Sequence, residues 1–277
     1  RAAMTIFSDF SKGDPAVPKR YWWILVSYIL CQLSGFVAIP LLTFLPPDQR
    51  QGFWITVSFL LTLSIAFMLL LPELGGDRHV KRAGFTSTVK WSFYGIVLIY
   101  LTQIAASIID VALFGAPQKS ENTEEVMELA NMTPYVMFVI VLAGPILEEI
   151  IFRKIIFGAI AQKTNFWIGA LISSLLFAFA HFDGHLIIYT SIGLVLCYLY
   201  SKTKRLIVSI TAHAAMNALV VIRFLPAIQK MIEEQERQNL SLITWLFNHD
   251  GAGRDEPFAL PSKGAVRTFR QTFKTDN

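Results

Sequence analysis

Long apolar runs, separated by short polar stretches, set the pattern of this sequence. About seven of these runs approach the roughly 20 residues that a helix needs to cross the bilayer core. The predicted spans are 21–45, 53–71, 91–114, 135–160, 166–182, 186–200 and 206–224. We therefore expect an all-α fold, a multi-pass integral membrane helical bundle with about seven to eight transmembrane helices.

The pattern changes after Pro226, where apolar and charged residues alternate in the way typical of an amphipathic helix at a membrane surface. The apolar run 240–247 is too short to cross alone, although a partial eighth span there would move the C-terminus to the other side. The polar sequence from Asn248 predicts disorder. The expected segments are a polar N-terminus (1–20), N-terminal transmembrane helices (21–131), a helical core (132–224) and an amphipathic helix with tail (225–277).

Composition supports this membrane interpretation. Hydrophobic residues make up 54% of the chain and charged residues only 16%, well below the roughly 25% charged residues of soluble domains. The net charge of +4 has no aromatic-interleaved basic patch beside it, so it favours anionic lipid over nucleic acid as its partner. Because Cys31 and Cys197 lie in apolar spans, we expect free thiols, with neither a disulfide nor a cysteine-ligated zinc site.

The basic residues of the connections predict the orientation. They fall at alternate ends of the predicted spans, on the side that the positive-inside rule makes cytoplasmic. The residues concerned are Lys12, Lys19, Arg20, Arg78, Lys81, Arg82, Lys163, Lys202, Lys204 and Arg205. We therefore expect a multi-pass protein of a bacterial cell membrane with a cytoplasmic N-terminus.

Three charged residues interrupt the fourth span. A charge at the bilayer centre costs at least about 2.5–3.5 kcal/mol, so such residues tend to be functional. Glu149 and Arg153 are four residues apart on one helix face and can neutralise each other. Glu148 points roughly 100° away from Glu149, so the Glu149–Arg153 pair leaves it without a partner. It could therefore serve as a base. The alternative is a structural charge cluster that ties helices together.

Two later spans carry residue pairs with the same four-residue spacing, Phe177 with His181 and His213 with Asn217. If the fourth and fifth spans form a hairpin about residues 164–165, Glu148 and His181 each lie roughly 25 Å from the turn and can meet. An acid, two imidazoles and an amide could then supply a base, a proton shuttle and hydrogen-bond donors. No such register relates Gln103, Asp110, Asp183 and His185, which we interpret as structural or loop residues.

The three motifs together resemble the signature of the CPBP family, the CAAX proteases and bacteriocin-processing enzymes also called Abi proteins or type II CAAX prenyl endopeptidases. The motifs are Glu148-Glu149-x-x-x-Arg153, Phe177-x-x-x-His181 and His213-x-x-x-Asn217, in the family's order and on three separate spans. The resemblance covers about residues 132–224, which marks this segment as a CPBP-like catalytic core.

This resemblance implies a glutamate-dependent intramembrane endopeptidase that acts on a membrane-associated peptide or protein and needs no cofactor or metal. It implies that Glu148 is the general base, that His181 helps to hold the attacking water, and that His213 and Asn217 stabilise the oxyanion. Glu149 and Arg153 would form the ion pair that orders the helix, and Phe177 would wall the cavity. The substrate, the role of prenylation and the oligomeric state stay open.

Two other interpretations remain open at this point. Glu148, His181 and His213 could form a zinc site of a metalloprotease, although the sequence has no H-E-x-x-H motif. The chain could instead be a non-catalytic immunity or peptide-binding membrane protein that uses the same cavity.

Overall fold

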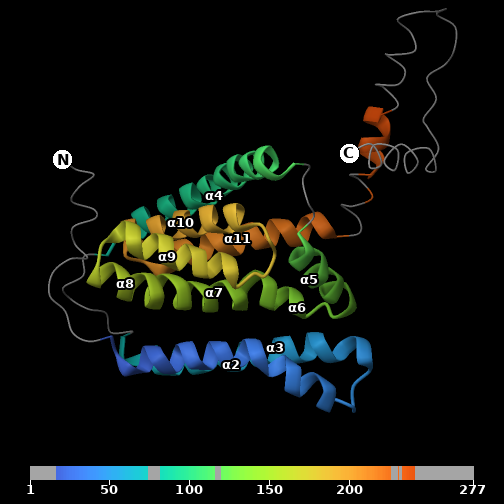
Figure 1. Ribbon diagram of the computed structural model, residues 1–277, viewed down its shortest axis with the longest axis horizontal. Helices are drawn as coiled ribbons and strands as arrows, with labels where there is room; N and C mark the ends of the chain where they lie inside the picture. The colour runs from blue at the N-terminus through green and yellow to red at the C-terminus, as the bar shows by residue number, and fades with distance from the viewer. Residues whose placement is uncertain (1–16, 74–81, 116–119, 226–229, 231–232, 241–277) are drawn as a thin grey trace, which may run out of the picture. The chain divides into compact units, whose positions relative to one another are not determined.

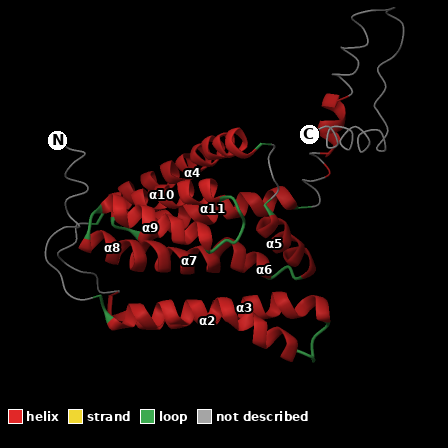
Figure 2. Cartoon of the chain, viewed as in Figure 1, coloured by secondary structure: helices red, strands yellow, loops and turns green. Residues whose placement is uncertain are grey.

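The computed structural model describes residues 17–73, 82–115, 120–225, 230 and 233–240. The chain forms two compact units, residues 1–221 and residues 222–277, and each is described by itself. Throughout the described part of the first unit, every regular element is a helix (Figure 2). This confirms the all-α prediction.

The N-terminal helices of the first unit are α2 (Lys19–Leu41), α3 (Pro47–Leu70), the short 3₁₀ turn η1 (Leu71–Glu73) and α4 (Phe85–Phe114). Helices α2 and α3 form an antiparallel hairpin and pack against each other (Figure 1). Pro47 starts α3 at a position where its missing N–H has no helical partner to lose. Helix α4 packs instead against α10 (Leu186–Thr203).

The acidic connection between the third and fourth predicted spans forms a helix of its own, α5 (Glu121–Met132). The Ser120 side chain caps its N-terminus by accepting a hydrogen bond from the Thr123 N–H, at 3.1 Å. Helix α5 is amphipathic, because Met127 and Leu129 are buried while several of its glutamates are exposed. Its acidic sequence predicted a connection but not this helix.

The fourth predicted span is one helical run that alternates between α and π geometry. Its parts are α6 (Val136–Phe138), π-helix η2 (Val139–Ala143), α7 (Gly144–Glu148), π-helix η3 (Glu149–Phe157) and α8 (Gly158–Lys163). Pro145 has no N–H to donate, which interrupts the normal hydrogen-bond ladder beside η2. Single π turns inside α-helices occur frequently at functional sites. Segment η3 contains Glu149 and Arg153, and η2 ends just before α7, the short helix that carries Glu148.

Three more helices complete the core: α9 (Phe166–Phe179), α10 and α11 (Leu206–Phe224). Helix α9 lies between the fourth-span run and α10 and packs against both (Figure 1). Small residues allow this approach, since a Cβ placed on Gly193 of α10 would lie 2.8 Å from the Ser174 Cβ of α9. The tight packing fixes the position of α9 and of the loop that follows it.

Five described helices are long and apolar enough to cross a membrane: Lys19–Leu41, Pro47–Glu73, Phe85–Phe114, Leu186–Thr203 and Leu206–Phe224. They agree with five predicted spans and confirm a multi-pass membrane protein. Helix α9 is shorter, with 14 residues, and the run 136–163 mixes helix types. That these two also cross the bilayer stays a prediction.

In the second unit, residues 233–240 are helical, and Arg237 donates to Glu234 at 2.6 Å. A surface location for an amphipathic helix in 225–277 stays a prediction, as do the other segment boundaries. The tail that was expected to be disordered, from Asn248 onwards, lies outside the described residues. So do Lys12, Arg78 and Lys81 of the orientation argument, and the cytoplasmic N-terminus stays a prediction as well.

Candidate active site

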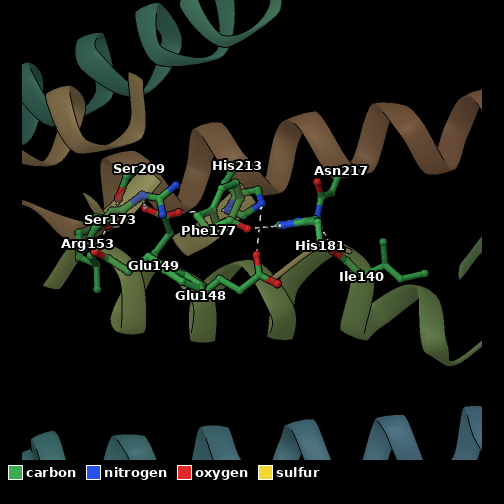
Figure 3. Close-up of polar contacts among 12 residues, drawn as sticks. Ile140, Glu148, Glu149, Arg153, Ser173, Phe177, His181, Ser209, His213 and Asn217 are labelled. Atoms are coloured by element: carbon green, nitrogen blue, oxygen red, sulfur yellow. Dashed lines mark hydrogen bonds and ion pairs between the residues drawn. The ribbon is translucent and has the colours of Figure 1, made fainter. Parts of the chain in front are cut away.

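The innermost part of the site is a buried ion pair. Arg153 Nε lies 3.4 Å from Glu149 Oε2, and both side chains are fully buried (Figure 3). The four-residue spacing on η3 predicted this contact. The guanidinium carbon also lies 4.4 Å from the centre of the Phe177 ring on α9. Burying an unpaired charge would be costly, so the carboxylate and the aromatic face together make this arginine tolerable.

His213 on α11 links the two glutamates. Its Nδ1 is 3.1 Å from Glu149 Oε1, and its Nε2 is 3.7 Å from Glu148 Oε2 (Figure 3). Because a carboxylate accepts hydrogen bonds, Nδ1 is the protonated nitrogen in this contact. Glu149 therefore binds both Arg153 and His213. Helix α11 thus brings His213 to Glu148, which the Glu149–Arg153 pair alone leaves without a partner.

The adjacent glutamates have different surroundings. The side chain of Glu149 is 0% exposed, whereas that of Glu148 is 19% exposed. Successive helical residues point in directions roughly 100° apart, so one carboxylate enters the protein interior while the other lies beside it. Of the two side chains, only that of Glu148 is partly exposed.

His181 comes from the turn that follows α9. Its Nδ1 donates to the Phe177 carbonyl oxygen at 2.8 Å, which leaves Nε2 available for other contacts. Both imidazoles pack on the Phe177 ring, with centroid separations of 4.5 Å for His181 and 5.7 Å for His213. The structure thus brings these residues into one cluster around Phe177 (Figure 3).

Asn217 lies one turn beyond His213 on α11. Its Nδ2 donates to the backbone oxygen of Ile140, at 2.9 Å, in the π-helical segment η2 (Figure 3). A π turn disturbs the regular backbone ladder, and here a side chain supplies a hydrogen bond to it. An amide nitrogen carries two hydrogens, so one donor of Asn217 stays available. The contact also fixes the direction of the amide.

Most of the polar residues that we interpreted from the sequence as structural or loop residues have other partners. His185 Nδ1 is 3.2 Å from Asp110 Oδ2, and the buried Asp183 accepts bonds from the hydroxyls of Tyr189 and Ser120. Gln103 lies on α4. The motifs did miss Tyr189, whose ring stacks on His181 with a centroid separation of 4.2 Å. It is on α10, and no spacing in the sequence relates it to α9.

Within the described part of the chain, no group of three or more His, Cys, Asp or Glu side chains is arranged to hold a metal ion. Two imidazole nitrogens already have partners, Nδ1 of His181 and Nδ1 of His213. Cys31 and Cys197 are both free and buried, which confirms the prediction for the thiols.

Comparisons with known proteins match the part of the chain that carries these residues. The family described as type II CAAX prenyl endopeptidase, Rce1-like, matches residues 130–219. The "Putative membrane peptidase YdiL" of Bacillus subtilis is 37% identical over 242 residues, which cover 83% of this chain and 99% of the relative. The "Membrane-embedded CAAX protease MroQ" of Staphylococcus aureus is 33% identical over 220 residues, covering 73% of this chain and 89% of that protein. No solved structure matches the chain.

Proposed function

This chain belongs to the Rce1-like family of type II CAAX prenyl endopeptidases, and we propose that Glu148 activates a water molecule that hydrolyses a peptide bond. The family and the name of the staphylococcal relative support a membrane-embedded endopeptidase. The three motifs predicted this membership. The substrate of the proposed reaction is a membrane-associated peptide or protein.

The observation that carries the proposal is the contrast between the two glutamates. Glu149 is fully buried and contacts Arg153 and His213. Glu148 is partly accessible and has an imidazole nitrogen 3.7 Å away. A gap of that size between polar atoms is one that a water can bridge. A general base must reach the water and exchange protons with it, and Glu148 meets both requirements.

The proposed reaction begins when the Glu148 carboxylate removes a proton from the water. The water oxygen then attacks the carbonyl carbon of the substrate and forms a tetrahedral intermediate. Glu148 returns the proton to the departing amine nitrogen as the carbon–nitrogen bond breaks. The unprotonated Nε2 of His181 accepts the other hydrogen of the water and holds its oxygen towards the substrate.

Two donors are proposed for the negative charge that develops on the carbonyl oxygen. With protons on both nitrogens, His213 donates to Glu149 through Nδ1 and to the oxyanion through Nε2. The second amide hydrogen of Asn217 donates to the same oxygen. Preorganised donors of this kind contribute about 2.7–4 kcal/mol each to transition-state stabilisation. The bonds to Glu149 and Ile140 preorganise them, because they fix the ring and the amide before substrate binds.

The direct test compares membrane peptides from cells that carry the native chain or Glu148→Gln at equal abundance. The substitution keeps the shape and removes the base. A peptide or protein that accumulates uncut with Glu148→Gln, and is cut by the purified native chain in detergent, supports the proposal and identifies the substrate. Equal peptide profiles would contradict it and favour the non-catalytic immunity or peptide-binding role.

The same purified reaction tests the zinc alternative. The two Nδ1 contacts occupy only one nitrogen of each imidazole, and metal-ligating histidines make the same kind of contact, so the chelator experiment separates the two roles. We expect cleavage to continue after prolonged dialysis against a strong zinc chelator. Loss of cleavage that added zinc restores would contradict a reaction without metal.

A further inference from the structure

Tyr189 is the aromatic residue nearest to His181 that the proposed reaction does not use. The two rings stack with a centroid separation of 4.2 Å and an interplanar angle of 25°. His181 also contacts the Phe177 ring, at 4.5 Å and 65°. The imidazole therefore contacts a ring from α9 and a ring from α10.

The Tyr189 ring has its own support. Its hydroxyl donates to Asp183 Oδ2 at 2.8 Å, and the Ser120 hydroxyl donates to the same oxygen at 2.5 Å. Asp183 is buried, and it lies in the turn between His181 and α10. A buried carboxylate forms strong, short hydrogen bonds. The tyrosine is therefore held at the ring by His181 and at the hydroxyl by Asp183.

These contacts leave the reactive nitrogen of His181 untouched. Nδ1 is bonded to the Phe177 carbonyl, and Tyr189 contacts the face of the imidazole. A hydrogen bond to Nε2 would have fixed the ring equally well but would have consumed the position needed for water. Stacking fixes the plane of the ring and keeps Nε2 available.

We propose that Tyr189 is a positioning residue for His181, and that Asp183 and Ser120 hold Tyr189 in place for this purpose. This inference rests on the proposed function, since it assigns His181 a role in holding the attacking water. It adds helix α10 and the N-cap of α5 to the elements that determine the geometry of the reaction, which already include the run 136–163, α9 and α11. Tyr189 itself does not touch the water or the substrate.

A structural test that needs no substrate uses nuclear magnetic resonance on the full chain in detergent, with labelled histidines. The chain has five histidines, and His181→Gln identifies the His181 signals. A stacked ring moves the imidazole proton signals upfield. We expect Tyr189→Leu to abolish this shift and Tyr189→Phe to keep it. As the matched control, Tyr198→Leu should leave it unchanged, because Tyr198 is on the same helix but packs against Trp91.

The kinetic test uses the peptide that accumulates with Glu148→Gln as its probe. We expect Tyr189→Leu to lower kcat on the order of 10- to 100-fold with KM unchanged, since small misplacements of a reacting group have effects of this size. Tyr189→Phe should lower kcat several-fold, because its ring stacks but has lost the bond to Asp183. Tyr198→Leu should have native kinetics.

Three results would overturn the inference. The first is a His181 signal in Tyr189→Leu at its native position. The second is a lost shift with native kcat, which would make the stacking merely structural. The third applies if Tyr189→Leu gives no folded protein: in that case a native kcat for Tyr189→Phe would overturn the inference. Native turnover in Glu148→Gln would instead overturn the proposed function, and the magnetic resonance result on the stacking would stand separately.

Discussion

The inner and outer parts of this site lie on one helical run yet present carboxylates in opposite circumstances. In the inner part, Glu149 is sealed from solvent and divided between Arg153 and His213. In the outer part, Glu148 is one residue earlier, partly accessible, and 3.7 Å from the other nitrogen of that histidine. Under the proposed function, these neighbouring identical residues have separate tasks, one for architecture and one for chemistry.

The cost of burial explains this division. Removing an ion from water costs several kcal/mol, and a partner charge with good geometry offsets that cost. Glu149 and Arg153 satisfy this condition only as a pair, so neither is free to change its charge during a reaction. Glu148 is partly accessible and belongs to no fully buried ion pair. His213 contacts both carboxylates and connects the two parts.

The largest stability effect should come from breaking the inner part. Glu149→Gln leaves Arg153 buried without a counter-charge, and breaking such a pair typically costs about 3–5 kcal/mol. We expect a lower yield of folded protein and a marked drop in Tm in detergent. The double variant Glu149→Gln with Arg153→Met should recover much of the loss, because it removes the unpaired charge. A single variant as stable as the native chain would contradict the architectural role.

A change in the outer part should affect turnover more than stability. Asn217→Ala removes a proposed oxyanion donor, which should cost about 2.7–4 kcal/mol in the activation barrier, or roughly 10²- to 10³-fold in kcat. It also removes the bond to Ile140, whose net contribution to folding is only about 1 kcal/mol. Kinetics and melting curves on one preparation measure both quantities. A native kcat for Asn217→Ala would show that Asn217 is not an oxyanion donor.

The smallest effect should come from an ion pair of Lys154, the residue that follows Arg153 on the same run. Lys154 Nζ lies 2.6 Å from Glu73 Oε2, with side chains 23% and 21% exposed. Because water reaches this pair and Arg20 also binds Glu73, Lys154→Met should change stability by about 1 kcal/mol or less. Its turnover should be native. A loss as large as that of Glu149→Gln would show that burial does not distinguish these two pairs.

The sequence predicted those features that depend on spacing along one helix. The length of the hydrophobic runs predicted the long helices, and the four-residue interval predicted the contact of Glu149 with Arg153. Contacts between helices depend on how far each helix is rotated about its axis, which spacing does not specify. The bonds from His213 to Glu149 and from Asn217 to Ile140 are of this kind, as is the stacking of Tyr189 on His181.

Two local features were also missed for physical reasons. The π segments have the apolar composition of an ordinary span, and only Pro145 indicates an interruption of the ladder. Helix α5 is acidic and only 12 residues long, so its hydrophobic pattern is short. Its Ser120 cap was the available signal, since a serine followed by acidic residues is typical of a helix start. The catalytic roles given to the site residues stay predictions until they are measured.

The most direct measurement of the central claim is the turnover and Tm of purified Glu148→Gln, beside the native chain, in the same detergent and on the same peptide. The account predicts that turnover falls about 10²- to 10⁴-fold, the usual contribution of a general base, while Tm stays at the native value. A Glu148→Gln protein that folds normally and cleaves at the native rate would show that this carboxylate does not activate the water.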